Sequence, residues 1–131
     1  MKSYDPDKQI DPDEWMALDD DERGYLVENY HTKKRFKMPN LKLHAIIHVV
    51  VENQIALGDA VPAKRALARL MRQGLSRHNA VHAIGSVLAS HIFDLMKHGP
   101  VSADLSADYS RQLEKLNAED WLNSLDESED D

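Results

Sequence analysis

The sequence predicts an all-α protein, a compact helical bundle of about five to six helices. Three observations favour this class. Only 6% of the 131 residues are aromatic and only five are glycine, whereas alanine, leucine and charged residues are plentiful, as is usual in helical proteins. Apolar residues recur at intervals of three and four, which is the period of a helix, and show no strand-like alternation. Helix-capping patterns precede most of these apolar stretches.

A chain of this length is expected to form a single helical domain over residues 1–131. Its core is expected at residues 12–125. The two ends, residues 1–10 and 126–131, are polar and acidic and lack helical periodicity, so we expect them to be flexible.

Two helices are expected in the first third of the chain. Asp11, Pro12 and Glu14 supply a cap, a first-turn proline and a capping-box acid for a short helix. The stretch 19–22 repeats this pattern and opens a second helix, which is expected to end near Lys34. The packed side of the second helix is expected at Tyr25, Leu26, Asn29 and Tyr30.

The stretch Leu41–Leu57 is the apolar centre of the sequence. Its apolar residues cover most of the circumference of a helix, which is typical of a helix in the middle of a protein. Yet this helix carries His44, His48 and Glu52, each four residues after the last. Burying such groups costs free energy unless each finds a partner, so this column requires an explanation.

Three further helical segments are expected after Gly58. They span residues 62–73, 76–97 and 101–125, and a further capping pattern at 117–120 lies within the last of them. The 76–97 helix begins at a Ser76 cap and carries His78 and His82, again four residues apart, beside its apolar stripe. Together with the 41–57 helix, it is expected to lie at the centre of the bundle.

The two polar columns predict a metal site whose ligands are His44, His48, Glu52, His78 and His82. Residues four apart on a helix have Cβ atoms about 5–6 Å apart, so two imidazoles can converge on one ion. Neutral imidazole with a carboxylate suits a divalent transition metal, and zinc or iron is expected. A ferritin-type di-iron site is disfavoured because Glu52 is the only acid in residues 29–58. The alternative is a buried polar network in which the same histidines hold the helices in register.

The last ligand depends on the relative direction of the two histidine helices. If they are parallel, the four histidines lie at about one level and Glu52 lies a turn away. If they are antiparallel, Glu52 comes level with the histidines of the second helix and His44 leaves the site. His48 and His82 belong to the site in both cases.

Other polar residues have smaller expected roles. Candidates to orient the ligands are Asn53, Gln54 and Arg77. Residues expected at the surface or at helix ends are His31, His91 and His98.

A metal with an open position would support a small hydrolase or an oxygen-handling enzyme, but the sequence favours no single reaction. Without cysteine, and with its serines outside any nucleophile turn, the chain does not indicate nucleophilic catalysis.

Charge is strongly segregated along the chain. Residues 31–99 hold three acids against eleven bases, whereas the segments on either side are acidic. The simpler interpretation is that the ends neutralise the middle. The alternative function is a binding or regulatory module for an anionic partner such as a nucleic acid. Its candidate contacts are Lys33, Lys34, Arg35, Arg65, Arg69 and Arg72.

Composition also excludes some classes of protein. The absence of cysteine excludes disulfides and thiolate metal sites. The polar start does not resemble a signal peptide, and His48 and Glu52 interrupt the longest apolar run, so we expect a cytoplasmic protein without a membrane span. The sequence does not indicate an oligomeric state.

Two segments carry a family resemblance. The runs PNLKLHAIIHVVVENQIALG and GLSRHNAVHAIGSVLASHIFDL share the pattern Leu-His-x-x-x-His-x-x-x-Glu-x-Gln followed by a second His-Ala-Ile segment. In this pattern the chain resembles a family of small, functionally uncharacterised bacterial all-helical proteins, over residues 39–97. The resemblance implies a helical fold and implies no activity.

Overall fold

The computed structural model describes residues 1–34, 40–98 and 105–129. Within these ranges the chain forms seven α-helices and one short 3-10 turn. The elements are α1 (Pro12–Ala17), α2 (Asp20–Lys33), α3 (Leu41–Ala56), η1 (Gly58–Ala60), α4 (Ala63–Arg72), α5 (Arg77–His98), α6 (Leu105–Lys115) and α7 (Ala118–Glu129). The prediction of an all-helical protein is confirmed. In the described part of the chain, no helix combines the length and the apolar character needed to cross a bilayer.

The helix count exceeds the predicted five to six because the segment expected at 101–125 contains two helices, α6 and α7. Side chains satisfy the backbone groups at the break. Arg69 of α4 donates to the carbonyl oxygens of Leu113 and Leu116, and the Asn117 side chain accepts from the N–H of Asp120 at 2.9 Å. Because the free carbonyls and N–H groups both find partners there, the chain can turn without leaving buried polar groups unpaired.

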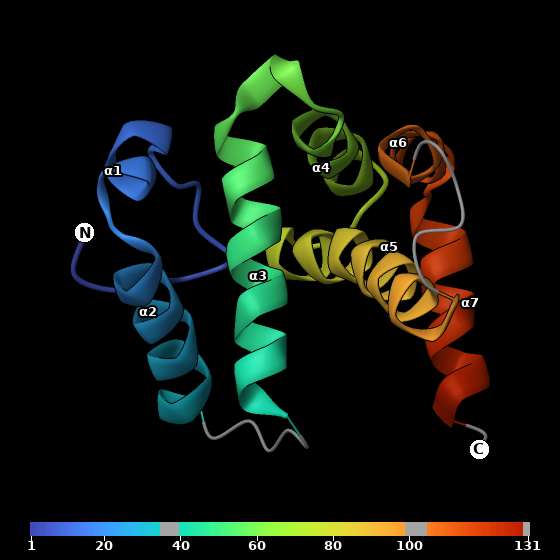
Figure 1. The fold of residues 1–131 in the computed structure, drawn as a ribbon. Coiled ribbons are helices and arrows are strands. Elements are labelled where there is room, and N and C mark those ends of the chain that lie inside the picture. The colour runs from blue at the N-terminus through green and yellow to red at the C-terminus, as the bar shows by residue number, and fades with distance from the viewer. Residues whose placement is uncertain (35–39, 99–104, 130–131) are drawn as a thin grey trace.

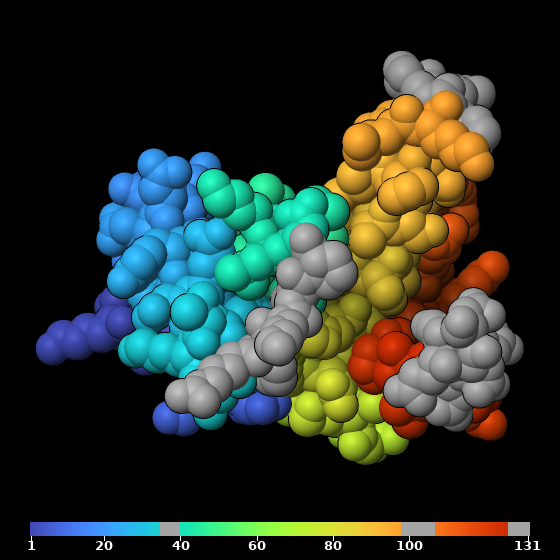
Figure 2. All heavy atoms as spheres, turned by 90° about the horizontal axis from the view of Figure 1, so that it is seen from below, coloured from blue at the N-terminus to red at the C-terminus, as the bar shows by residue number. Residues whose placement is uncertain are grey.

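Helix α3 is the central element, as predicted. It contacts α1, α2, α4 and α5, and Figure 1 shows α2 and α4 on opposite sides of it. The two histidine helices, however, are neither parallel nor antiparallel. Helix α5 begins beside the middle of α3 and leads across and away from it (Figure 1). The view from below in Figure 2 shows the C-terminal half of α5, in orange, projecting away from α2 and α3.

Two separate hydrophobic clusters pack against α3. The smaller one includes Tyr4, Trp15 and Val27 and lies between the N-terminal segment, α1, α2 and α3. The larger one joins Val51 of α3 to α4, α5, α6 and α7, with Ile84 at its centre among the fully buried side chains. The same helix therefore supplies one wall to each cluster, which explains why its apolar residues cover so much of its circumference.

A third face of α3 remains open. Leu43 is 46% exposed and Ile46 is 57% exposed, so the expectation of a helix buried on all sides is only partly met. The two clusters occupy the faces that carry Ala45 and Val51, and Leu43 and Ile46 belong to neither cluster.

The N-terminal segment before α1 is not helical, but it packs on the bundle. Tyr4 and Pro6 are buried, and the Asp7 carboxylate accepts from the backbone N–H of His78 at 3.0 Å. This segment was expected to be flexible because it has no periodicity. Its contacts are instead made by single residues, which no periodic pattern reveals.

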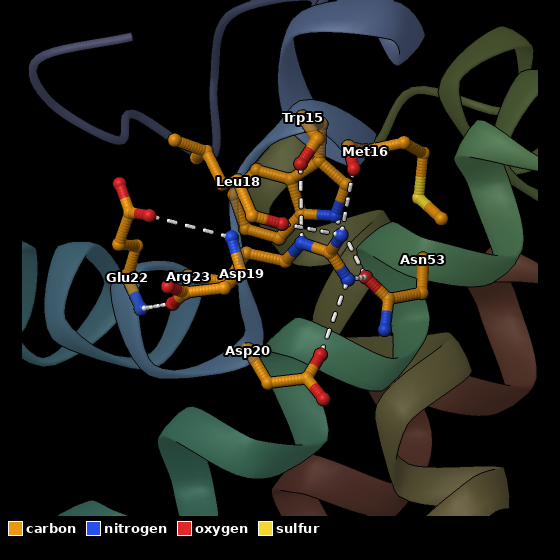
Figure 3. A network of polar contacts seen from close by, with 8 residues as sticks. All are labelled: Trp15, Met16, Leu18, Asp19, Asp20, Glu22, Arg23 and Asn53. Carbon is orange, nitrogen blue, oxygen red and sulfur yellow. Dashed lines mark hydrogen bonds and ion pairs between the residues drawn. The ribbon is translucent and has the colours of Figure 1, made fainter.

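A buried arginine joins the first three helices (Figure 3). Arg23 of α2 is 7% exposed. Its guanidinium donates to the carbonyl oxygens of Trp15, Met16 and Leu18, at 3.1, 3.1 and 2.7 Å. It also donates to the Asn53 side chain of α3 at 3.2 Å, which accepts from the Trp15 indole N–H at 2.8 Å as well. The guanidinium thus satisfies the free carbonyls at the end of α1 and fixes α1 and α2 on α3.

We predict that Arg23→Ala lowers the free energy of unfolding by about 3 kcal/mol, because it removes a buried guanidinium that donates to the carbonyl oxygens of Met16 and Leu18 and to the Asn53 side chain. Urea unfolding followed by circular dichroism measures the change. The matched control is Arg72→Ala, since Arg72 is an exposed arginine of α4, and it should change stability by less than about 0.5 kcal/mol. Equal effects of the two substitutions would contradict the role given to Arg23.

Candidate metal centre

Five histidines from three helices lie together where the first turns of α5 meet the middle of α3. Helix α2 contributes His31, α3 contributes His44 and His48, and α5 contributes His78 and His82. Four of these residues, His31, His48, His78 and His82, each offer a ring nitrogen within 4.8 Å of the other three. The structure therefore brings together three of the five residues predicted as ligands and adds His31 to them.

The Nε2 atoms of three rings converge. His82 Nε2 lies 3.0 Å from His48 Nε2 and 3.1 Å from His78 Nε2. A ring nitrogen of a neutral histidine carries either one proton or one lone pair. His82 Nε2 can therefore form a good hydrogen bond with only one of its two neighbours. A cation between the rings would satisfy all of these lone pairs at once.

The spacing is close to that of a metal site. In a tetrahedral zinc site with metal–nitrogen bonds of about 2.0–2.1 Å, neighbouring ligand atoms lie about 3.4 Å apart. The two measured Nε2 separations are slightly shorter, and the widest separation within the group of four is 4.8 Å. Small ring movements would thus place four nitrogens around one ion.

Glu52 lies next to this group but is committed to another partner. Its two carboxylate oxygens accept from the guanidinium of Arg77 at 2.7 and 2.9 Å. Both residues are buried, at 2% and 6% exposure. Arg77 precedes His78 by one residue at the start of α5, so this two-pronged ion pair fastens the first turn of α5 to α3. Burial alone would lower the pKa of Arg77, but the hydrogen bonds and the charge of Glu52 raise it.

Tyr4 connects this ion pair to the histidines. Its hydroxyl donates to the Glu52 carboxylate at 2.6 Å and lies 3.0 Å from His48 Nδ1. Since the hydroxyl has one proton and gives it to the carboxylate, the His48 contact is made by an Nδ1–H that donates to the Tyr4 oxygen. That tautomer leaves a lone pair on His48 Nε2, the atom that faces His82. Burial, followed by the charge of Glu52, raises the pKa of the Tyr4 hydroxyl well above its usual value.

His31 corrects the expectation of a surface or capping residue, because its side chain is fully buried. Its Nδ1 lies 2.8 Å from the carbonyl oxygen of Val27, one helical turn earlier. A carbonyl oxygen only accepts, so Nδ1 carries the proton and Nε2 carries the lone pair. The missed signal is the spacing of Arg23, Val27 and His31, which are all buried at intervals of four. The predicted packed side of α2 was wrong in part, since Tyr25 is 64% exposed.

His44 stands beside the group of four. Its ring centroid is 4.7 Å from those of His31 and His48 and 5.0 Å from that of His82. Its Nε2 is buried and has no hydrogen-bond partner among the described residues. Burial, followed by the neighbouring histidines His31 and His78, lowers the pKa of His44 to about 4.

Burial also keeps the other rings neutral. It lowers the pKa of His82 to about 3, and it lowers the pKa of His48 further still, with His82 as the next cause. The pKa of His78 is lowered by burial, although the nearby carboxylate of Asp7 acts in the opposite direction. These rings therefore present lone pairs at neutral pH, which is the form that binds metals.

The residues expected to orient the ligands separate into two groups. Arg77 acts near the site through Glu52. Asn53 bonds instead to Trp15 and Arg23, and Gln54 accepts from the Tyr109 hydroxyl at 2.7 Å. Both amides hold other parts of the bundle. Tyr4 and Val27 are the partners that the sequence did not reveal.

The basic residues of the alternative function are divided between two places. Lys33 and Lys34 lie at the exposed end of α2, and Arg35 falls outside the described residues. Arg65, Arg69 and Arg72 belong to α4, on the opposite side of α3 (Figure 1). Arg69 is already bonded to the carbonyl oxygens of Leu113 and Leu116.

Metal-free protein, prepared with a chelator, should lose stability as the pH falls below about 7. The folded pKa values of His44 and His82 lie below the usual value of 6.5. The unfolded chain therefore binds more protons at mildly acidic pH, and each extra proton lowers the unfolding free energy by up to about 1.4 kcal/mol per pH unit. Urea unfolding between about pH 7 and pH 5 measures the slope, and His44→Gln should make it shallower. A stability that is constant or rises over this range would contradict the prediction.

In comparisons with known proteins, no protein-family model, curated protein or solved structure matches the chain. The resemblance to small bacterial helical proteins over residues 39–97 therefore stays a prediction. The function is argued from the geometry of the site alone.

Proposed function

We propose that this protein binds one divalent transition metal ion, zinc or iron, through the imidazoles of His31, His48, His78 and His82. The observation that carries the proposal is the convergence of the His48, His78 and His82 Nε2 atoms at 3.0 and 3.1 Å around a point where protons cannot satisfy every contact. His31 supports it as a fourth nitrogen within the same 4.8 Å group.

The surroundings of the rings support a ligand role rather than a purely structural network. A metal-binding histidine typically donates its second N–H to a carboxylate, a carbonyl oxygen or another acceptor, which fixes the tautomer and the ring orientation. His31 has the Val27 carbonyl in this position and His48 has the Tyr4 hydroxyl. In both cases the proton sits on Nδ1 and the lone pair on Nε2.

The donor set favours the borderline metals that imidazole prefers. Four neutral nitrogens suit zinc, iron, copper or nickel better than magnesium or calcium, which select oxygen ligands. Glu52 is paired with Arg77, so we assign it the role of holding Tyr4 and α5 in place. His44 is assigned to the edge of the site, as a neighbour of the ligands.

Metal analysis of protein produced without a histidine tag tests the proposal. We expect about one metal ion per chain, because four preorganised nitrogens bind a single ion. His48→Ala and His82→Ala should each abolish stoichiometric binding. The matched control is His91→Ala, since His91 lies against Tyr109 of α6, away from the cluster.

Three results would contradict metal binding. One is wild-type protein that takes up no zinc or iron when titrated with either ion. Another is equal metal loss from the His91 control. A third is a melting temperature that is the same with metal and with chelator, because binding to the folded state alone must stabilise it. The third result would favour the structural network instead.

The Tyr4 hydroxyl should contribute to metal affinity without touching the metal. Tyr4→Phe removes the acceptor for His48 Nδ1–H, so the ring loses its fixed orientation, and affinity should fall by about 10–100-fold. Competition with a chromophoric chelator measures this change. Tyr25→Phe is the control, since Tyr25 is largely exposed. Unchanged affinity in Tyr4→Phe would show that the hydroxyl does not orient His48.

A further inference from the structure

A small cavity opens beside the histidine cluster, between α3 and α5. Its volume is about 210 Å³. The residues that line it divide into a histidine end and an end of apolar or small side chains. The histidine end is formed by His44, His48 and His82.

The histidine end gives the cavity access to one edge of the proposed metal centre. His48 and His82 belong to the group of four, whereas His31 and His78 do not line the cavity. A molecule in the cavity would therefore meet the centre only at the His48–His82 edge. His44 also lines the cavity, and its buried Nε2 has no hydrogen-bond partner among the described residues.

The other end of the cavity exists because two residues of α5 are small. Gly85 and Ala89 of α5 lie one helical turn apart, and both line the cavity together with Ile47 of α3. A Cβ atom added at Gly85 would come 2.9 Å from the Ile47 side chain, so glycine allows the two helices to approach closely. Ala89 lies on the next turn of α5, and its small side chain leaves the cavity open where a larger one would fill it.

The lining also indicates the chemistry of the occupant. None of its residues carries a carboxylate, an ammonium or a guanidinium group. Placing a charged group away from the histidine end would leave that charge without a partner, which is costly. An engineered cavity of about 150 Å³ holds benzene, so this cavity has room for a ring of similar size.

We propose that the cavity binds a small uncharged molecule with one lone-pair nitrogen or oxygen atom directed at the metal and an apolar body against Ile47 and Ala89. The inference rests on the proposed metal binding. It adds a fifth coordination position at the His48–His82 edge, beyond the four histidine nitrogens, with His44 beside the bound atom. A zinc-type centre can expand from four to five ligands, and an exogenous molecule in the cavity would supply the fifth.

Pyridine is a suitable probe, because it combines a lone-pair nitrogen with an apolar ring. The full-length chain is loaded with cobalt(II), whose visible spectrum reports its ligands, and titrated with pyridine. We expect a saturable spectral change with cobalt still at about one ion per chain after desalting. Ala89→Leu should weaken pyridine binding by about tenfold or more while cobalt content is retained, because the added side chain fills the cavity.

Two further variants make the test specific. Ala60→Leu, at an exposed alanine of η1, should bind pyridine as the wild type does. Ser86→Leu narrows the same cavity from an exposed position and should also weaken binding, which keeps the test available if Ala89→Leu does not fold.

The outcomes separate the two proposals. Failure to load cobalt, zinc or iron would overturn the metal site, and this inference with it. Stoichiometric cobalt with no spectral response to pyridine would overturn the inference alone. So would a response that Ala89→Leu and Ser86→Leu leave unchanged, or a response caused by the release of cobalt from the protein.

Discussion

The arrangement of this protein depends on one buried ion pair, between Glu52 of α3 and Arg77 of α5. Removing two charges from water costs several kcal/mol for each ion, and the cost is met only when every remaining donor and acceptor finds a partner. Tyr4 and the carbonyl oxygen of Pro6 complete this requirement. The pair therefore holds three segments together that are distant in the sequence: the N-terminal segment, the middle of α3 and the first turn of α5. The histidines are carried to one place by the same contact.

The ion pair also determines the chemistry of the cluster. With Glu52 neutralised by Arg77, the rings meet without a carboxylate among them, so the candidate centre offers nitrogen donors only. Burial lowers the pKa of His44, His48, His78 and His82 and keeps these rings neutral, since charging several of them in one place would be costly. The Tyr4 hydroxyl donates to Glu52 of the ion pair and accepts from His48 Nδ1–H. It thereby determines that Nε2 of the His48 ring carries the lone pair. Structural stability and readiness for a ligand thus arise from the same buried groups.

Different faces of helix α3 make different contacts. One face joins the aromatic cluster around Trp15, another joins the core around Ile84, and the histidine column lies at the boundary between them. The angle at which α5 crosses α3 leaves the cavity beyond His82, because two helices that cross separate as they leave the point of contact. Gly85 keeps the crossing close and Ala89 keeps the space open. A cavity beside a cluster of lone pairs is therefore a result of helix packing and not of a loop.

The sequence alone determined the helices, because capping boxes, prolines and apolar periodicity act over a few residues. It also determined the two histidine columns, since residues four apart on one helix are neighbours whatever the tertiary structure. Only the tertiary structure decided which partner each polar group found. Tyr4 reaches His48 and Glu52 across 44 and 48 residues of chain, and Asp7 reaches the start of α5 across 71. Such contacts follow from the way α5 crosses α3, and local sequence patterns do not encode a crossing angle. For this reason Glu52 was predicted as a ligand and is the partner of an arginine, while His31 was predicted at the surface and lies in the cluster.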